Sequence, residues 1–460
     1  MLADVTFMVS ASVALTGVAE SFVAHEIFAA ERFSASALEL GALPSGGSGP
    51  DAVARDADSV TTVVIDEATM QRVGGISLLR GLSALSPREI VNYVQENVAQ
   101  MNAVRDARIA PAEITAWWAA MPSAAQKAMA SSVPQVLGSL DGVPAAVRGP
   151  ANEDALERAT EGIRERAASG IGKGERRKLG QQQRMLEAVA AALTSKPGEP
   201  ERTLLEFDER GAGRAVIVIG DLDSADYVSY LVPGMYFSVQ QQILDWTDTA
   251  ATLAVTQQQW LQDVPEGLSP QRVATIAWLG YQTPDLLNVG GLELAQSGAD
   301  ALEQSWQGIR ATRGAHQPFL AVLAHSYGST AAMIALQRHS EQIDALALIG
   351  SPGSASQTAR DLGVADDQVY VGEASWDPIV DTAFYGSDPG SKSFGAMRIG
   401  VGGGVDPLTK KTMGGSVGHN AYFAAGSESL RNLALIGIGR GTWVTDPDGA
   451  EAGTSLAQAR

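Results

Sequence analysis

The stretch Phe319-Leu-Ala-Val-Leu-Ala-His-Ser-Tyr-Gly-Ser-Thr330 decides the fold of this chain. Its first six residues are apolar, which predicts a buried strand over 319–324, and residues 329–339 have the character of a helix. A sharp turn between the two would lift the hydroxyl of Ser326 out of the sheet. The start of the following helix would supply N–H groups near any negative charge that forms there. This context predicts that Ser326 is a nucleophile.

The usual motif for such a serine, G-x-S-x-G, occurs elsewhere without this context. Gly414-Gly-Ser-Val-Gly418 matches it at every position, whereas Ala324 replaces the first glycine before Ser326. No convincing strand precedes Ser416, and no helix follows it. We therefore interpret Ser416 as a flexible loop serine.

The partners of Ser326 are predicted from their order along the chain, which in this fold is nucleophile, acid, then histidine. Of the five histidines, His25 and His316 precede Ser326, His325 adjoins it and His339 ends the next helix, which leaves His419 as the base. The acid is expected just after a strand over 368–373, where Asp377 could orient the imidazole. The alternative acids are Glu373, Asp381 and Asp388.

Two backbone N–H groups are predicted to stabilise an oxyanion. One belongs to Tyr327 and the other to Met235, in the turn Val232-Pro-Gly-Met-Tyr236. An ordinary Pro-Gly turn is the alternative for Met235. Aromatic residues near the motifs are predicted to form an apolar substrate wall, namely Tyr236, Trp278, Tyr281, Trp376 and Tyr422.

The composition limits the partners of the 460-residue chain. Its 52 acidic and 33 basic residues give a formal net charge of −19, which argues against nucleic acid and disfavours adsorption to anionic membranes. The absence of cysteine excludes disulfides and thiolate ligands, and no histidine pair has metal-ligand spacing, so we expect no metal and no cofactor. The uncharged run over 5–19 is shorter than the ~20 residues of a bilayer span. We expect a soluble protein without a transmembrane segment, cytoplasmic or exported without a cleaved signal.

Two compositional regions meet near residue 200. An Ala-rich helical region is predicted over 1–200, and its Gly/Pro turn at 138–144 is expected to pack against the catalytic face. A largely parallel sheet covered on both faces is predicted over 201–445, followed by a loose tail over 446–460. The expected strands are 203–207, 215–219, 227–232, 273–278, 319–324, 345–349, 369–373 and 397–401. The expected helices are 11–30, 68–85, 87–107, 112–131, 152–168, 174–195, 239–253, 299–312, 329–339 and 356–362, with a helix or strand over 422–438.

Several stretches together resemble an actinobacterial α/β-hydrolase family long catalogued as a domain of unknown function. They are Gly220-Asp221, 225–226, 231–234, 277–281, 324–328, Asp377-Pro378 and His419 with Tyr422, and upstream Trp117-Trp118, 138–144, Arg148 and 151–152. The resemblance covers roughly residues 114–441 and implies the α/β-hydrolase fold with a Ser-His-Asp triad. Met235 departs from the small polar residue that is common at its position in that family.

The sequence thus predicts a serine hydrolase that cleaves small carboxylic esters with an apolar acyl group, through an acyl-enzyme on Ser326. Hydrolysis of amides or peptides by the same triad is one alternative. A non-catalytic, secretion-associated binding protein built on a decaying hydrolase is the other.

Overall fold

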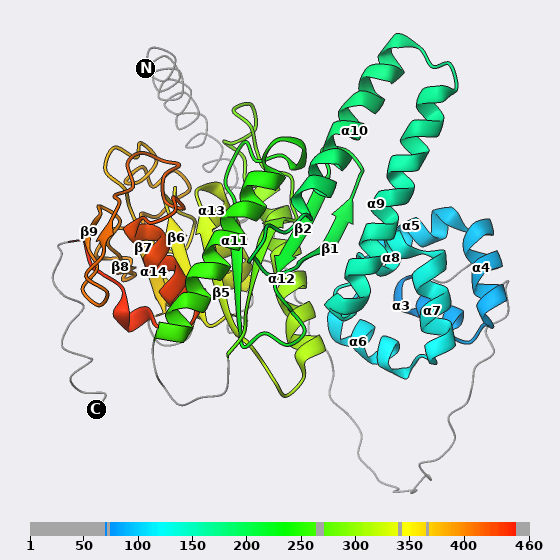
Figure 1. The fold of residues 1–460 in the computed structure, drawn as a ribbon, viewed down its shortest axis with the longest axis horizontal. Helices are drawn as coiled ribbons and strands as arrows, with labels where there is room; N and C mark the ends of the chain where they lie inside the picture. The colour runs from blue at the N-terminus through cyan, green and yellow to red at the C-terminus, as the bar shows by residue number, and fades with distance from the viewer. Residues whose placement is uncertain (1–69, 71–73, 264–270, 339–342, 365–367, 448–460) are drawn as a thin grey trace, which may run out of the picture.

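The computed structural model describes residues 70, 74–263, 271–338, 343–364 and 368–447 (Figure 1). Helices come first along this part of the chain, and a sheet with interleaved helices follows from residue 202. The predicted fold class, an α/β-hydrolase sheet preceded by a helical region, is therefore confirmed. The helices before the sheet are α3 (Gly75–Ser83), α4 (Pro87–Glu96), α5 (Val98–Asp106), α6 (Pro111–Ala120), α7 (Ser123–Ser132), α8 (Pro134–Leu137), α9 (Ala145–Ala168) and α10 (Lys173–Ala192).

Two of the predicted helices are each broken in the structure. The helix expected over 87–107 is interrupted at Asn97, whose side-chain amide donates to the Tyr93 carbonyl at 2.8 Å and competes with the helical backbone. The helix expected over 112–131 is interrupted before Pro122, which forces the preceding residue into an extended conformation. The helix expected over 11–30, His25 and His339 lie outside the described residues.

In the described residues, eight strands form one sheet in the order β1-β2-β4-β3-β5-β6-β7-β8. β2 pairs antiparallel with both of its neighbours, whereas every pair from β4 to β8 is parallel. The parallel strands therefore all end at one edge, here called the carboxyl edge. The strands are β1 (Arg202–Asp208), β2 (Arg214–Ile219), β3 (Tyr227–Val232), β4 (Val273–Leu279), β5 (Phe319–His325), β6 (Ala345–Ile349), β7 (Val369–Gly372) and β8 (Met397–Arg398), with β9 (Gly404–Val405) and β10 (Thr412–Met413) as a separate pair.

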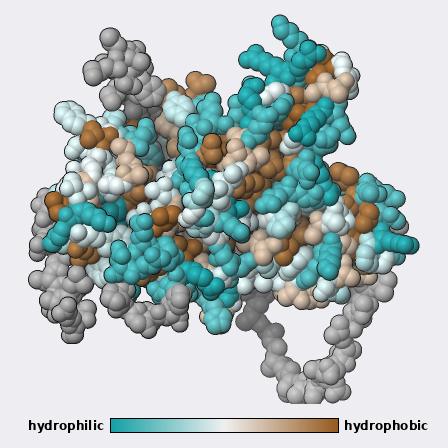
Figure 2. Space-filling model, in the orientation of Figure 1, coloured by the Kyte–Doolittle hydropathy of each residue, from teal (hydrophilic) through white to brown (hydrophobic). Residues whose placement is uncertain are grey.

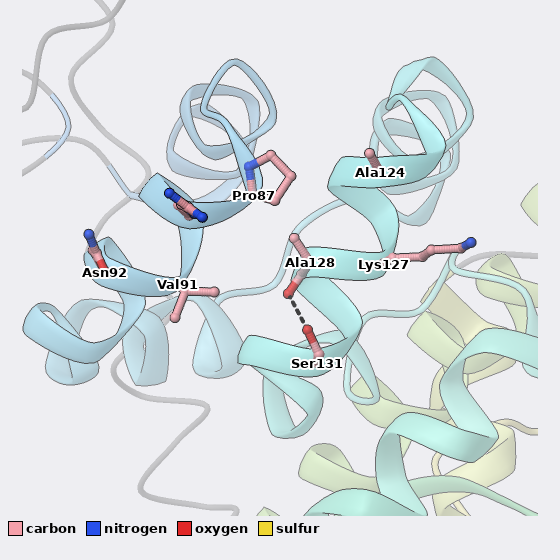
Figure 3. A pocket seen from close by; sticks show the side chains of 8 residues that line it. Pro87, Val91, Asn92, Ala124, Lys127, Ala128 and Ser131 are labelled. Carbon is pink, nitrogen blue, oxygen red and sulfur yellow. Dashed lines mark hydrogen bonds between the residues drawn. The ribbon is translucent and has the colours of Figure 1, made fainter.

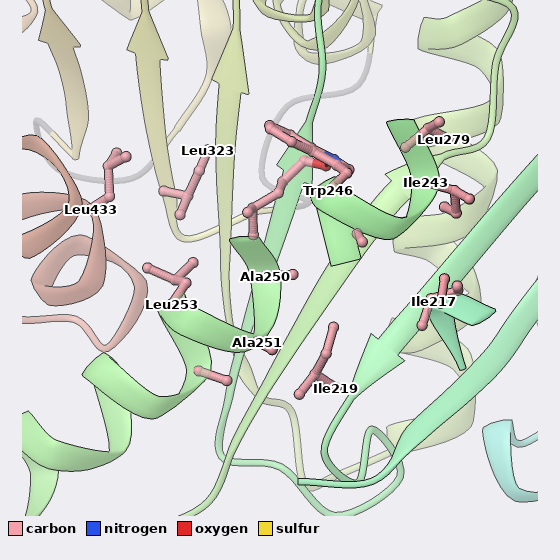
Figure 4. Packing of buried hydrophobic residues seen from close by; sticks show 14 of the residues in the cluster. Ile217, Ile219, Ile243, Trp246, Ala250, Ala251, Leu253, Leu279, Leu323 and Leu433 are labelled. Carbon is pink, nitrogen blue, oxygen red and sulfur yellow. The ribbon is translucent and has the colours of Figure 1, made fainter. Parts of the chain in front are cut away.

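The sheet is apolar on both faces because helices cover both. Side chains alternate along each strand, so in β2 Ile217 and Ile219 join one core cluster while Val216 and Val218 join the other. Figure 4 shows the first cluster, in which Trp246 and Leu253 of α11 lie over the sheet. That face is covered by α11 (Val239–Asp263) and α14 (Glu428–Gly437), and the opposite face by α12 (Glu293–Arg313) and α13 (Tyr327–Arg338). No described helix combines the length and the apolar character that a bilayer span requires.

The helical region is attached to the sheet at its outer strand, β1. The buried amide of Asn152 in α9 donates to the carbonyls of Leu204 and Leu205 at 3.0 and 2.8 Å, where the register of β1 is irregular. Arg148 and Asn152 both donate to the Gly138 carbonyl as well. The turn over 138–144 is thus tied to β1 through α9, and it also packs on α12, where a Cβ at Gly308 would lie 2.9 Å from the Cβ of Asp141. These contacts place the turn against α9 and α12, and its packing against the catalytic face stays a prediction.

Asn152→Ala should lower the free energy of unfolding by about 2–4 kcal/mol, because the buried carbonyls of Leu204 and Leu205 lose this donor. Urea unfolding followed by circular dichroism would measure this change. Asn92→Ala, at an exposed position on α4, is the matched control and should stay within about 0.5 kcal/mol of the wild type. An equal, small effect of both substitutions would contradict the attachment of α9 to β1.

Candidate active site

The backbone at Ser326 is held in a conformation that non-glycine residues rarely adopt. Ser326 has a φ of +55° and stands between the end of β5 and the start of α13. Its N–H donates to the Ile349 carbonyl of β6 at 2.9 Å, which fixes the turn on the sheet. Two glycines leave the space that the turn needs: a Cβ at Gly328 would lie 2.5 Å from the Pro233 carbonyl oxygen, and one at Gly234 would lie 2.5 Å from the Cβ of Ser326.

The structure brings the predicted base and acid to this serine. The hydroxyl of Ser326 lies 2.8 Å from Nε2 of His419, and Nδ1 of His419 lies 2.9 and 3.0 Å from the two carboxylate oxygens of Asp377. The Asp377 side chain has no exposed surface, whereas 18% of the His419 side chain is exposed. The imidazole can therefore reach a bound molecule while its carboxylate partner stays shielded from water.

Asp377 is kept ionised by its hydrogen bonds. Burial alone would raise the pKa of this carboxyl, but hydrogen bonds from His419, the Tyr422 hydroxyl and the Ile379 N–H bring the pKa below its ordinary value. The Tyr422 hydroxyl lies 2.6 Å from Oδ2 of Asp377 and accepts from the Ala374 N–H at 2.8 Å. A charged acceptor is thus always available to the Nδ1–H of His419.

His325 supports the site in a way that the sequence analysis did not anticipate. Its Nε2–H donates to the backbone carbonyl of His419 at 2.7 Å, and the two rings lie 4.7 Å apart. Burial, with the neighbouring His419 as a smaller cause, lowers the pKa of His325 to about 3. His325 therefore stays neutral near pH 7 and ties the turn of Ser326 to the loop of His419.

Gly350, after β6, is a second site residue that the sequence analysis missed. It has a φ of +56°, and a Cβ there would lie 2.9 Å from Oδ2 of Asp377 and 3.2 Å from the His419 ring. A glycine at the end of the strand, in Ile349-Gly350-Ser351, could have suggested that another segment packs closely against the backbone there. No known sequence motif includes this glycine.

The three alternative acids lie together, and among the described residues the ring nitrogens of His419 bond to Asp377 and Ser326 and to none of these three. One carboxylate oxygen from each of Glu373, Asp381 and Asp388 lies within 4.8 Å of the others, a spacing that could hold a metal ion. Burial, and then the negative charge of Asp388, raise the pKa of Glu373 to about 7. Arg398 lies 3.5 Å from Glu373 and offsets part of the negative charge of this group. The absence of a metal cofactor stays a prediction.

The two predicted oxyanion donors flank the serine. Tyr327 is the first residue of α13, and Met235 follows the glycine that touches Ser326. In the described part of the chain, neither N–H has a hydrogen-bond acceptor. The Tyr281 hydroxyl donates to the Pro233 carbonyl at 2.7 Å and so supports the Met235 turn from behind.

Three of the five predicted wall residues are buried supports. Trp278 and Tyr281 stack on each other inside the core, and Tyr422 is fully buried against Asp377. Since strand β4 carries Trp278 toward α12, its ring fills the core and does not face a substrate. Only Tyr236 and Trp376 have large exposed surfaces, 40% and 87%.

Ser416 is a buried structural serine, so its interpretation as a flexible loop residue is wrong. It is 1% exposed, its N–H donates to the Val401 carbonyl at 2.7 Å, and its hydroxyl donates to the Ala421 carbonyl. These bonds fold the glycine-rich loop that carries His419.

A separate hollow of about 480 Å³ lies in the helical region, between α4 and α7 (Figure 3). Its lining is mostly small or apolar, with Arg88 and Lys127 as its charged members: Pro87, Arg88, Val91, Asn92, Ala124, Lys127, Ala128 and Ser131. None of the predicted site residues lines it.

Residues 208–387 match the family model described as alpha/beta hydrolase. This segment has the α/β-hydrolase fold. The match includes Ser326 and Asp377 and ends before His419. It confirms the resemblance seen in the sequence, and the strand order of the domain agrees with it.

Two mycobacterial relatives match different shares of the chain. The uncharacterized protein Rv2079 of Mycobacterium tuberculosis is 27% identical over 381 residues, and the match covers 72% of this chain and 56% of the relative. The uncharacterized protein Rv0963c of the same species is 28% identical over 230 residues, and the match covers 48% of this chain and 84% of the relative. The chain thus spans little more than half the length of Rv2079.

Two solved structures show a distant likeness. A hyperthermophilic esterase from the archaeon Pyrobaculum calidifontis has a TM-score of 0.31 and 15% identity, and covers 60% of this chain and 96% of its own. LAE6, an alpha/beta hydrolase enzyme from the metagenome of Lake Arreo, has a TM-score of 0.32 and 12% identity, and covers 63% and 96%. At these scores the fold assignment depends on the strand order and on the family match.

Glu373→Gln should stabilise the protein at pH 8 and have little effect at pH 5. The folded state holds the Glu373 proton more tightly than an unfolded chain, where the pKa is about 4.5, so the wild type loses stability as the pH rises toward and through 7. With the screening by solvent at this partly buried carboxyl, the difference should be about 1–2 kcal/mol. Urea unfolding at both pH values would measure it. Glu165→Gln, at an exposed position on α9, is the control, and equal effects at both pH values would refute the elevated pKa.

Proposed function

We propose that the protein is a serine hydrolase that cleaves carboxylic esters, with Ser326 as nucleophile, His419 as general base and Asp377 as the residue that orients it. The observation that carries this proposal is the continuous hydrogen-bonded series from Ser326 through His419 to Asp377. A hydroxyl, an imidazole and a shielded carboxylate in this order are the parts that acyl transfer through serine requires.

The chemistry follows from the directions of these hydrogen bonds. Oγ of Ser326 attacks the ester carbonyl carbon while its proton passes to Nε2 of His419. The negative charge on the carbonyl oxygen is stabilised by the N–H groups of Tyr327 and Met235. The C–O bond to the alcohol then breaks, and the alcohol leaves with the proton from His419. A water molecule, deprotonated by His419, attacks the acyl-enzyme and releases the acid and the free Ser326 hydroxyl.

The surroundings of the serine support an ester with an apolar acyl group. Tyr236 adjoins Met235 and Trp376 adjoins Asp377, and both expose apolar surface beside the reacting groups. Binding clefts for such substrates are mostly apolar, with a few placed polar groups. The neutral His325 adds no charge beside the substrate, because it keeps a single proton near pH 7.

A fluorophosphonate probe should label the intact protein on Ser326, because only an activated serine reacts with it. Ser326→Ala should abolish labelling and lower the turnover of p-nitrophenyl esters by roughly 10⁴-fold or more. Mass spectrometry of the labelled peptide identifies the serine. The matched control is Ser169→Ala, at an exposed position just after α9, which should keep the labelling of Ser326. Failure of the folded wild-type protein to react would reject the proposal.

Tyr422→Phe should lower kcat/KM by about tenfold, since the change removes a hydrogen bond to a charged carboxylate. Without the Tyr422 hydroxyl, Asp377 becomes easier to protonate, so the acid limb of the pH–rate profile should move to higher pH. A merely structural role of Tyr422 would lower activity equally at every pH. Tyr370→Phe, a buried tyrosine whose hydroxyl bonds to Gln368, is the control and should leave the shape of the profile unchanged.

A further inference from the structure

Exposed apolar side chains gather on the loops that carry the site. In the described residues, nine large hydrophobic side chains are strongly exposed, and five of them form what we call the apolar rim: Tyr236, Leu286, Leu287, Trp376 and Val417. Leu287 is 95% exposed and Trp376 is 87% exposed, so neither contributes to the core. Apolar surface that gathers at one place marks a contact with another apolar phase or molecule.

One half of the apolar rim follows β3 and β4. The Tyr236 N–H donates to the Pro284 carbonyl at 2.9 Å, and the Thr283 hydroxyl donates to the Phe237 carbonyl. These bonds join the Tyr236 turn to the loop that carries Leu286 and Leu287. Since the preceding Gly234 touches Ser326, this half lies on one side of the nucleophile.

The other half follows β7 and the glycine-rich loop. Ser375 pairs with Val417 in an isolated bridge, and the Gly418 N–H donates to the Ser375 carbonyl at 2.9 Å. Trp376 and Val417 therefore adjoin Asp377 and His419 on paired segments. Because His419 bonds to Ser326, this half lies on the opposite side of the nucleophile from Leu287.

A second surface of distinctive chemistry lies at the free end of the α9–α10 hairpin. Residues 162–184 contain seven basic and two acidic residues, a net charge of +5 in a chain whose formal charge is −19. All seven are exposed and form what we call the basic tip: Arg164, Arg166, Lys173, Arg176, Arg177, Lys178 and Arg184. Lys173, Arg177 and Lys178 form no ion pair with any described carboxylate.

The basic tip and the apolar rim face the same side of the molecule. Met185 of α10 packs on Gly213, in the β1–β2 turn, and β2 pairs with the end of β4, so this turn lies at the carboxyl edge. From Met185 to Lys173 the helix continues for about 18 Å beyond that edge. Figure 1 shows the hairpin projecting past its neighbours, and its end is mostly hydrophilic in Figure 2.

We propose that the protein binds an anionic lipid surface through the basic tip and the apolar rim, and hydrolyses esters held in that surface. The statement about hydrolysis rests on the proposed function, whereas the statement about binding does not. A lipid surface fits both features, because phosphate headgroups attract Lys and Arg and acyl chains accept Leu and Trp. Nucleic acid offers the phosphates but no apolar interior for Leu287.

The charge of the whole chain does not oppose this contact. Electrostatic interactions fall off over about 8–10 Å at physiological salt. Within this distance of the basic tip, a surface meets the excess of positive charge on residues 162–184 and not the net charge of the whole chain. The sequence-based expectation against anionic membranes used the net charge alone, which does not show where the charges lie.

Sedimentation of the full chain with vesicles tests the binding. Ser326→Ala protein is mixed with vesicles of equal parts phosphatidylglycerol and phosphatidylcholine, or of phosphatidylcholine alone, so that hydrolysis cannot alter the surface. We expect binding to the anionic vesicles at least about tenfold tighter than to the neutral ones, and weaker as salt rises.

Two variants and two matched controls assign this binding to the surfaces. Lys173→Glu with Arg177→Glu and Lys178→Glu should weaken it by about a hundredfold or more. The same charge change at Arg80, Arg88 and Lys127, all exposed on α3, α4 and α7, should weaken it far less. Leu287→Ser should weaken it several-fold, and Val98→Ser, exposed on α5, should not.

The outcomes separate the two proposals. The proposed lipid contact is overturned if neutral and anionic vesicles bind equally, or if the basic-tip variant binds as tightly as the chain without those substitutions. It is also overturned if the protein prefers duplex DNA to the vesicles in a competition experiment. If Leu287→Ser binds the vesicles as tightly as the chain that keeps Leu287, the apolar rim takes no part in the lipid contact. If the probe labels wild-type Ser326 but vesicles do not bind, the surface proposal fails alone. If vesicles bind but no serine is labelled, the proposed function fails alone.

Discussion

The site depends on one strained residue, Ser326, whose left-handed backbone is held between a strand and a helix. The strain persists because the surroundings fix it: the Ser326 N–H is bonded to β6, and Gly234 and Gly328 let the β3 loop approach to contact distance. This turn sets where the hydroxyl, the first N–H of α13 and the Met235 turn lie. Every other group near the serine is arranged around that fixed point.

A continuous polar network spreads this constraint across three loops. The carboxylate of Asp377 accepts hydrogen bonds from His419, the Tyr422 hydroxyl and the Ile379 N–H. The His325 ring donates to the backbone carbonyl of His419. Each buried polar atom in this network has a partner, which makes the arrangement specific because an unpaired member would be costly. The loops after β5, β7 and β10 are therefore held as one unit, even though they are far apart in sequence.

The sequence predicted what local patterns encode. Continuous apolar strands, the turn at Ser326 and the order of Asp377 and His419 could all be found without a structure, since each follows from spacing or order. Long-range packing could not: the burial of Trp278, the bond from His325 to His419 and the space left by Gly350 depend on which strands become neighbours. The excess of basic residues at the end of the α9–α10 hairpin was not predicted for a related reason, because the composition gives only the net charge of the whole chain.

The attachment of the helical region also solves a problem that an open sheet creates. An outer strand with free carbonyls can recruit a strand from another molecule and start aggregation. On β1, Asn152 occupies the carbonyls of Leu204 and Leu205, and Arg105 donates to that of Phe207 at 3.1 Å. Side chains from two helices thus take the places that a foreign strand would use, so the helical region acts as a built-in guard against self-association through the sheet.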